Sequence, residues 1–183
     1  PVFREALAKY VSKKFNVNIQ QDNIIVSPGA RFSIFTAITT LLNPGDEMVV
    51  IEPAWPAYKD CALNSGIKVR TISTTFEGKW EPSLEQIKST INSNTKMIVL
   101  NYPNNPTGKI LNEKLQDDII EIAKKNNLYI LSDEIYSQYA KTNWKSILSY
   151  NYDKSIVTQS FSKSHAMTGF RVGYGIASKQ IIE

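Results

Sequence analysis

The chain has 183 residues, which fits one ordinary domain, and its 42% hydrophobic and 21% charged residues are typical of a globular protein with a buried core. Its formal net charge is +4, but lysines and arginines are mixed with acids along most of the sequence, which argues against a nucleic-acid partner. No apolar run approaches the roughly 18 residues of a membrane span, so we expect no membrane partner and a cytoplasmic location. The single Cys61 excludes an internal disulfide and is expected to be a buried thiol.

Apolar runs of strand length recur along the chain, with segments of helical periodicity between them. The expected strands are Asn23–Val26, Glu47–Glu52, Lys68–Ser73, Met97–Asn101, Leu128–Ser132, Ser155–Gln159 and Val172–Ala177. The expected helices are Ala30–Leu42, Trp55–Ser65, Ser83–Ile91 and Asn112–Asn126, and a basic amphipathic stretch, Pro1–Asn16, precedes them. Continuous apolar runs are typical of strands that helices cover on both faces. The pattern therefore predicts an α/β fold with a largely parallel sheet and right-handed crossovers.

Ligands of such folds bind beyond the carboxyl ends of the strands, so candidate site residues are expected directly after the strands. After the first strand, Ser27–Arg31 opens a helix, where small residues let an anion approach backbone N–H groups at the positive end of the helix dipole. A plain turn before a helix explains the same glycine. After the second strand, Trp55 offers a ring that can stack on a flat ligand or pack into the core.

The later strands are followed by more polar and ionisable side chains. Asn101–Gly108 is a loop rich in turn formers with two neighbouring side-chain amides. Asp133 ends the fifth strand, and a carboxylate buried there costs several kcal/mol unless a cation pairs with it. Ser160–His165 and Arg171 bring hydroxyls, an amine and a guanidinium to the rim around the sixth strand. Taken singly, each of these residues is better explained as part of a solvated loop.

Taken together, the order and spacing of these motifs resemble one family. From Phe3 to Ala177 the chain is similar to the large domain of fold-type I pyridoxal-phosphate enzymes, specifically the class of aspartate and aromatic aminotransferases. The matching segments are Ser27–Ala30, Asn43–Asp46, Asn105–Gly108, Ser132–Tyr136, Ser160–Lys163 and Gly169–Gly173. The resemblance implies a three-layer α/β/α fold with a mostly parallel seven-stranded sheet and one antiparallel strand. It also implies that residues 1–183 form the cofactor-binding domain, without the N-terminal segment and the C-terminal small domain of the whole enzyme.

The resemblance implies roles around a pyridoxal 5′-phosphate ring and no metal ion. Lys163 would form the Schiff base with the cofactor and then move a proton as a free amine. Asp133 would keep the pyridine nitrogen protonated, so that the ring can accept electrons. Tyr136 and the amide of Asn105 would hydrogen-bond the 3′ oxygen, and Trp55 would lie against the ring face. Of these, Lys163, Asp133 and Tyr136 would be the catalytic residues.

The resemblance also implies a phosphate site made of helix-start amides, hydroxyls and one permanent cation. The residues expected there are Gly29, Ala30, Arg31, Ser160, Ser162 and Arg171. Arg31 is expected to contribute through its backbone. His165, the only histidine, is expected to be a structural or rim residue and not a general base.

The function implied is transfer of an amino group between an amino acid and a 2-oxo acid, by a parent enzyme that is a homodimer. The arginine that binds the substrate α-carboxylate would lie outside this chain, so we expect the isolated domain to turn over poorly and the amino acid to stay unidentified. Two alternatives stay open. One is a carbon–sulfur β-lyase, although Asn104, Asn105 and Tyr136 stand where those enzymes tend to have histidines. The other is a pyridoxal-phosphate-sensing domain of a transcription regulator, which an upstream DNA-binding domain would reveal. A nicotinamide-binding domain is disfavoured because no G-x-G-x-x-G motif follows the first strand.

Overall fold

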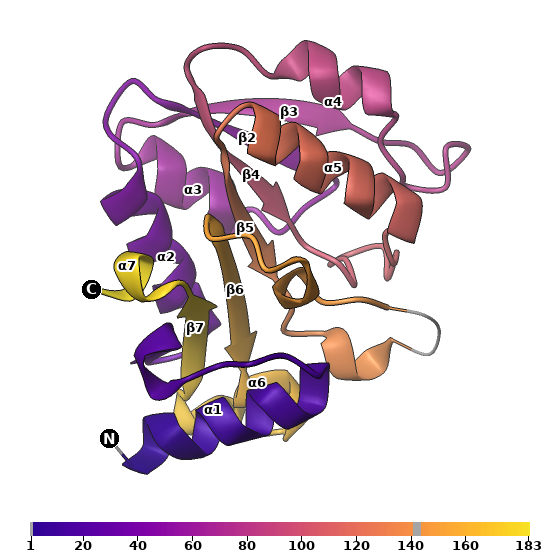
Figure 1. Ribbon diagram of the computed structural model, residues 1–183. Coiled ribbons are helices and arrows are strands. Elements are labelled where there is room, and N and C mark those ends of the chain that lie inside the picture. Colours follow the sequence, from indigo (N-terminus) through magenta and orange to yellow (C-terminus); the bar gives the residue numbers. More distant parts are fainter. Residues whose placement is uncertain (1, 141–143) are drawn as a thin grey trace.

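A seven-stranded sheet runs through the middle of the protein, as Figure 1 shows for the computed structural model, which describes residues 2–140 and 144–183. The strand order is β1-β7-β6-β5-β4-β2-β3. The strands are β1 (Ile24–Ser27), β2 (Glu47–Glu52), β3 (Lys68–Ser73), β4 (Thr95–Leu100), β5 (Tyr129–Asp133), β6 (Ser155–Ser160) and β7 (Gly173–Ala177). Strand β7 is antiparallel to both of its neighbours, and the other six strands share one direction. The expected mostly parallel sheet with one antiparallel strand is confirmed.

Helices cover both faces of the sheet, which gives the expected three layers (Figure 1). One face packs against α1 (Val2–Phe15), α4 (Leu84–Thr90) and α5 (Glu113–Lys125). The other packs against α2 (Ala30–Leu41), α3 (Ala57–Leu63) and the short α7 (Lys179–Ile182). Single turns complete the chain: α6 (Phe161–Ser164), η1 (Gln21–Asn23), η2 (Ser137–Tyr139), η3 (Ile147–Tyr150) and η4 (Thr168–Phe170).

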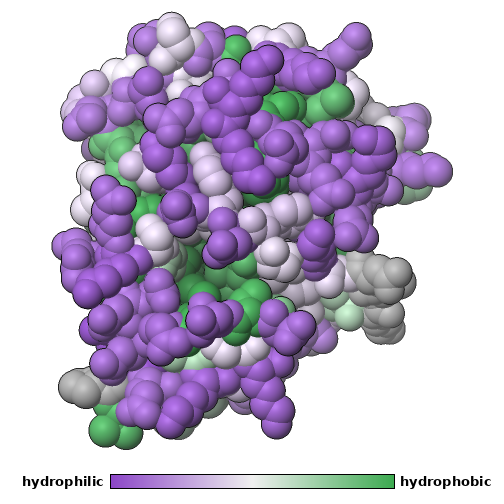
Figure 2. All heavy atoms as spheres, viewed as in Figure 1, coloured by the Kyte–Doolittle hydropathy of each residue, from purple (hydrophilic) through white to green (hydrophobic). Residues whose placement is uncertain are grey.

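The amphipathic N-terminal stretch is helical as α1, although Pro1, its first residue, lies outside the described part of the chain. On the face shown in Figure 2 hydrophilic residues predominate, and hydrophobic ones show in patches between them. Within residues 2–140 and 144–183, no helix combines the length and the apolar character that crossing a bilayer requires.

Two hydrophobic cores form because successive side chains of a strand point to opposite faces. In β2, Val49 and Ile51 join the core beneath α1 and α5, whereas Met48 and Val50 join the core beneath α2 and α3. All four are buried, which explains why the strand reads as one continuous apolar run. Cys61 is 7% exposed in the second core, as expected.

Two element boundaries differ from the prediction in a way that matters for the site. Helix α3 begins at Ala57 and not at Trp55, because the ring of Pro56 disfavours the helical conformation for the residue before it. Trp55 therefore lies in the loop at the sheet edge. Strand β5 extends one residue further than expected, so that Asp133 is its last residue and pairs in register with Thr158 of β6.

Gly173, the first residue of β7, is where the strand and the start of α2 come into closest contact. A Cβ atom added to Gly173 would lie 2.4 Å from the backbone nitrogen of Ala30 and 2.4 Å from the carbonyl carbon of Gly29. Both of these are backbone atoms, which have no side-chain freedom to move aside. The absence of a side chain at Gly173 thus fixes how close α2 lies to the sheet.

We expect Gly173→Ala to lower the free energy of unfolding by roughly 1–3 kcal/mol or more, because the new methyl group overpacks a backbone contact. Gly169→Ala is the matched control, since nothing lies within 4 Å of a Cβ atom added there, and its effect should stay within about 0.5 kcal/mol. Chemical denaturation of the two variants measures both values. Equal stabilities would contradict the close approach.

Candidate functional site

The carboxyl ends of the six parallel strands meet at one edge of the sheet, near α6 in Figure 1. Because β7 runs the opposite way, its beginning lies at the same edge, and Arg171 precedes it by two residues. Side chains from loops far apart in the sequence are therefore brought to one rim, as the motif order predicts.

A pocket of about 180 Å³ lies at this edge. It is lined by Trp55, Tyr58, Asn101, Asn105, Asp133, Ile135, Tyr136 and Lys163. Five of these are sequence-predicted site residues: Trp55, Asn105, Asp133, Tyr136 and Lys163. The other three were missed by the sequence analysis.

Asp133 is 1% exposed and accepts hydrogen bonds on both carboxylate oxygens. Oδ2 accepts a bond of 2.6 Å from Tyr58 Oη, and Oδ1 accepts bonds from Thr158 Oγ1 (3.2 Å) and the Ile135 backbone N–H (3.4 Å). Burial raises the pKa of Asp133, and these three donors partly oppose the rise. None of the ion pairs between described residues includes it. The carboxylate thus has neutral donors around it and an open side toward the pocket.

Tyr58 is fully buried on α3, and its ring packs edge-on against Trp55 with 5.5 Å between centroids and an interplanar angle of 87°. Burial, followed by the charge of Asp133, raises the pKa of Tyr58 well above its ordinary value, so the phenol stays a proton donor. No sequence signal marks Tyr58, because it lies within α3 and its contact with Asp133 arises only when this helix packs beside the end of β5.

Two asparagines organise the loop after β4, and the first of them ties it to the end of β5. Asn101 donates from Nδ2 to the backbone oxygen of Asp133 (3.2 Å), and its Oδ1 accepts from the Asn105 backbone N–H (3.1 Å). Asn104 stabilises the loop in two ways. Its Oδ1 accepts a hydrogen bond from the Thr107 N–H within the loop (3.0 Å), and its Nδ2 donates to the carbonyl of Pro53, which follows β2 (3.1 Å). Only the second amide of the Asn104-Asn105 pair lines the pocket.

Lys163 and Tyr136 both line the pocket. Lys163 belongs to α6, and its backbone oxygen accepts a hydrogen bond of 2.7 Å from Tyr139 Oη. Burial, with the charge of Asp133 second, raises the pKa of Tyr136. His165 is exposed, packs edge-on against Phe161 and bonds Ser164 through Nδ1, so it lies at the rim.

The hydroxyl of Ser160 caps α6. It accepts from the Ser162 backbone N–H (3.0 Å) and donates to the Val172 carbonyl (3.1 Å). Ser160 itself is 4% exposed, and the Ser162 hydroxyl lies 2.9 Å from it. The two serines thus join the start of α6 to the residue before β7. An anion would compete with these internal bonds for their hydroxyls.

Beside the pocket, the start of α2 and Arg171 form a cationic corner. Gly29 precedes the helix with φ of +93°, and a Cβ atom there would lie 2.3 Å from Arg171 Nη2, so the guanidinium rests directly on this glycine. Arg171 also donates to the carbonyls of Pro28 (3.3 Å) and Thr168 (3.1 Å). The first amides of a helix, here from Ala30 onward, lack acceptors within the helix. An anion at this corner would meet helix amides and a fixed cation.

Arg31 and Arg171 line a neighbouring cavity of about 400 Å³ and not the pocket of Lys163 and Asp133. Arg31 lines this cavity and contacts Trp55 of the pocket, with its guanidinium carbon 5.6 Å from the centroid of the Trp55 ring. The Arg31 side chain, from which the sequence analysis expected nothing, therefore stacks on the pocket wall.

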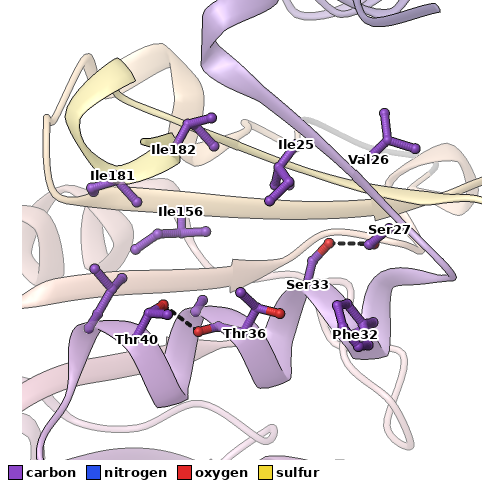
Figure 3. A pocket seen from close by; sticks show the side chains of 13 residues that line it. Ile25, Val26, Ser27, Phe32, Ser33, Thr36, Thr40, Ile156, Ile181 and Ile182 are labelled. Carbon is purple, nitrogen blue, oxygen red and sulfur yellow. Dashed lines mark hydrogen bonds between the residues drawn. The ribbon is translucent and has the colours of Figure 1, made fainter.

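A further cavity, of about 110 Å³, is apolar and lies between α2, α7 and the sheet (Figure 3). Isoleucines such as Ile156 and Ile181 line it, and the polar groups there are hydroxyls: Ser27 bonds Ser33 at 2.6 Å, and Thr40 bonds the Thr36 carbonyl. No lining residue carries a titratable side chain. This cavity is no candidate for acid–base chemistry.

Glu134, the residue directly after Asp133, is 1% exposed and is held by hydrogen bonds of its own. It accepts hydrogen bonds from Ser132 Oγ (3.0 Å), Ser146 Oγ (2.8 Å) and the Ile147 N–H (3.0 Å). These bonds fasten the segment that begins η3 to the end of β5. Burial raises the pKa of Glu134 to about 7, against the lowering effect of these donors.

The sheet order and this edge define an α/β protein with a candidate small-molecule site at the carboxyl ends of its strands. The family model for aminotransferase class I and II matches residues 1–183, and the chain belongs to that family.

Similar proteins and solved structures agree with this family assignment. The chain is 37% identical over 181 residues to an aspartate aminotransferase of Thermotoga maritima, which covers 97% of this chain and 48% of that protein. It is 38% identical to a probable N-acetyl-LL-diaminopimelate aminotransferase of Bacillus subtilis, over 97% of this chain and 46% of that one. The crystal structure of the Thermotoga maritima enzyme matches with a TM-score of 0.94 and 36% identity, over 98% of this chain and 48% of that chain. The chain spans about half the length of the curated relatives it matches.

The raised pKa of Glu134 predicts how stability depends on pH. Because the folded pKa, about 7, lies above the ordinary value of 4.5, the native state binds this proton more tightly than the unfolded chain does. The resulting stability is fully present below about pH 4.5 and is lost as pH rises through 7. We expect Glu134→Gln to remove roughly 2–3 kcal/mol of this decline, measured by urea unfolding across the range. An equally steep decline in Glu134→Gln would assign it to another group.

Proposed function

We propose that this chain is the large, cofactor-binding domain of an aminotransferase that uses pyridoxal phosphate to move an amino group between an amino acid and a 2-oxo acid. The observation that carries the proposal is the pocket that Lys163 and Asp133 share, in a chain of the class I and II aminotransferase family.

The donor set fits pyridoxal phosphate. Asp133 is a buried carboxylate that lacks an ion-pair partner among the described residues, and a protonated pyridine nitrogen would supply the missing cation. Trp55 gives the pocket an aromatic wall suited to a flat ring. The amides at the start of α2 and the guanidinium of Arg171 suit a phosphate dianion.

When bound, pyridoxal phosphate supplies an electron sink for the substrate carbon. The chain supplies the rest. The Nζ of Lys163 would hold the cofactor covalently and, as a free amine, would move a proton at the substrate α-carbon. Asp133 would hold a proton on the ring nitrogen, while Tyr136 Oη and the Asn105 amide would donate hydrogen bonds to the ring oxygen.

On the phosphate side, Arg171 and the first amides of α2 would bind the phosphate group, and Trp55 would lie against the ring face. The guanidinium of Arg31 contacts Trp55 from the neighbouring cavity.

Amino-group transfer is favoured over the two alternatives. The matched relatives are named transaminases, and Asn105 and Tyr136 line the pocket where a β-lyase tends to have histidines. Relatives of 34–38% identity carry different substrate names, including aspartate, asparagine and N-acetyl-LL-diaminopimelate, so we propose only the amino acid and 2-oxo acid class. A homodimeric parent enzyme and a cytoplasmic location remain predictions.

We expect borohydride reduction to fix pyridoxal phosphate covalently to the wild-type protein and not to Lys163→Ala, because only the Lys163 amine lines the pocket beside Asp133. Mass spectrometry of the reduced protein measures the label. Lys179→Ala, on the remote α7, is the control and should label like wild type. Equal labelling of Lys163→Ala would refute the assignment.

We expect Arg171→Leu to weaken the binding of pyridoxal phosphate by about 10–100-fold, since a charge-assisted hydrogen bond is worth about 1.5–3 kcal/mol. Pyridoxal, which has the same ring without the phosphate, should bind both proteins alike. Fluorescence titration with each compound makes the comparison. A similar loss for pyridoxal would show that Arg171 does not act on the phosphate.

A further inference from the structure

We propose that Tyr58 is a positioning residue that holds the Asp133 carboxylate in place and in its charged form, ready to pair with a cationic ring nitrogen. The inference rests on the proposed function and adds a residue outside the motifs that the sequence resemblance used.

The contact itself is short and shielded from water. Tyr58 Oη lies 2.6 Å from Asp133 Oδ2, within the range of a hydroxyl that donates to a charged carboxylate. Tyr58 is 0% exposed and Asp133 is 1% exposed, so water does not compete for either group. The ring of Tyr58 is held by the hydrophobic core beneath α3 and by its edge-on contact with Trp55.

Asp133 needs this donor because its surroundings oppose a charge. Burial is the largest influence on its pKa and raises it, and the hydrogen bond from Tyr58 is the foremost influence that lowers it. The ionisable groups that face Asp133 are Tyr58 from α3, Glu134 and Tyr136 from the end of β5, and Lys163 from α6. Of these, Tyr58 is the one that donates a hydrogen bond to the carboxylate.

Tyr58 and a ring nitrogen do not compete for the same position. A carboxylate has about four lone-pair sites, and the protein uses three of them, through Tyr58, Thr158 and the Ile135 N–H. The donors from α3 and β6 approach different oxygens, so together they fix the carboxylate plane. Replacing Tyr58 by phenylalanine would keep the ring packing and leave a buried oxygen without its donor.

The test is a double-mutant cycle in the full-length protein, read out by the affinity for pyridoxal phosphate across pH. Tyr58→Phe should weaken binding about tenfold at neutral pH and move the acid limb of the binding profile up by about one pH unit. In an Asp133→Asn background, which has no charge to protect, the same change should have almost no effect. Tyr152→Phe is the matched control: its hydroxyl donates to the carbonyls of Leu128 (2.7 Å) and Ala123 (3.3 Å), away from the pocket, and its loss should leave binding unchanged.

Two results would overturn the inference: an equal loss of affinity in the Asp133→Asn background, or a loss that does not vary with pH. Either would mean that the hydroxyl of Tyr58 acts through packing alone.

A measurement without cofactor separates this inference from the proposed function. Because removing the donor raises the folded pKa of Asp133 further, the unfolding equilibrium constant of Tyr58→Phe relative to wild type should grow about tenfold from acid to neutral pH. The Asp133→Asn background should abolish this growth, and a constant ratio would refute the role of Tyr58. A wild-type protein that binds no pyridoxal phosphate but shows this growth would contradict only the proposed function.

Discussion

One mostly parallel sheet covered by helices on both faces is the constraint on which the rest of the structure depends. With both faces buried, polar side chains can reach a ligand only from the loops at the strand ends. Six strands share a direction, so those loops converge at one edge, and residues from Gly29 to Arg171 meet there. The chemistry of the site follows from which polar residues stand directly after an apolar run.

The burial that stabilises the sheet also raises the free-energy cost of a charged carboxylate at its edge. Asp133 and Glu134 are adjacent, nearly inaccessible carboxyl groups, and they are stabilised by different means. Glu134 is surrounded by donors that tie down the η3 segment, and it has a structural role. Asp133 has donors on two sides and an open third side toward the pocket. This asymmetry distinguishes Asp133, the carboxyl group proposed to face a ligand, from Glu134 more clearly than sequence position does.

Most of the fold could be predicted from the sequence because its signals are local. Continuous apolar runs marked the strands, and helical periodicity between them marked the layers, with errors of one or two residues at the ends. The errors with consequences came from tertiary effects: Pro56 delays α3, and pairing with Thr158 extends β5 to Asp133.

In the site, the strand-end motifs led to Trp55, Asn105, Asp133, Tyr136 and Lys163 because each follows a recognisable strand. Tyr58 and Thr158 were not found, since one lies in a helix and the other in a strand. Their importance arises only when α3 and β6 pack beside Asp133.

The reversed direction of β7 limits how far apart Lys163 and Arg171 can lie. Because β6 ends and β7 begins at the same edge, residues 161–172 form one connection without a crossover helix, and it carries both Lys163 and Arg171. The ladder between β6 and β7 pins the two ends of this connection, from Ser160 paired with Gly173 onward. The span between the Lys163 amine and the Arg171 guanidinium is therefore limited by the length of this single connection, so a change in its length would alter both positions together.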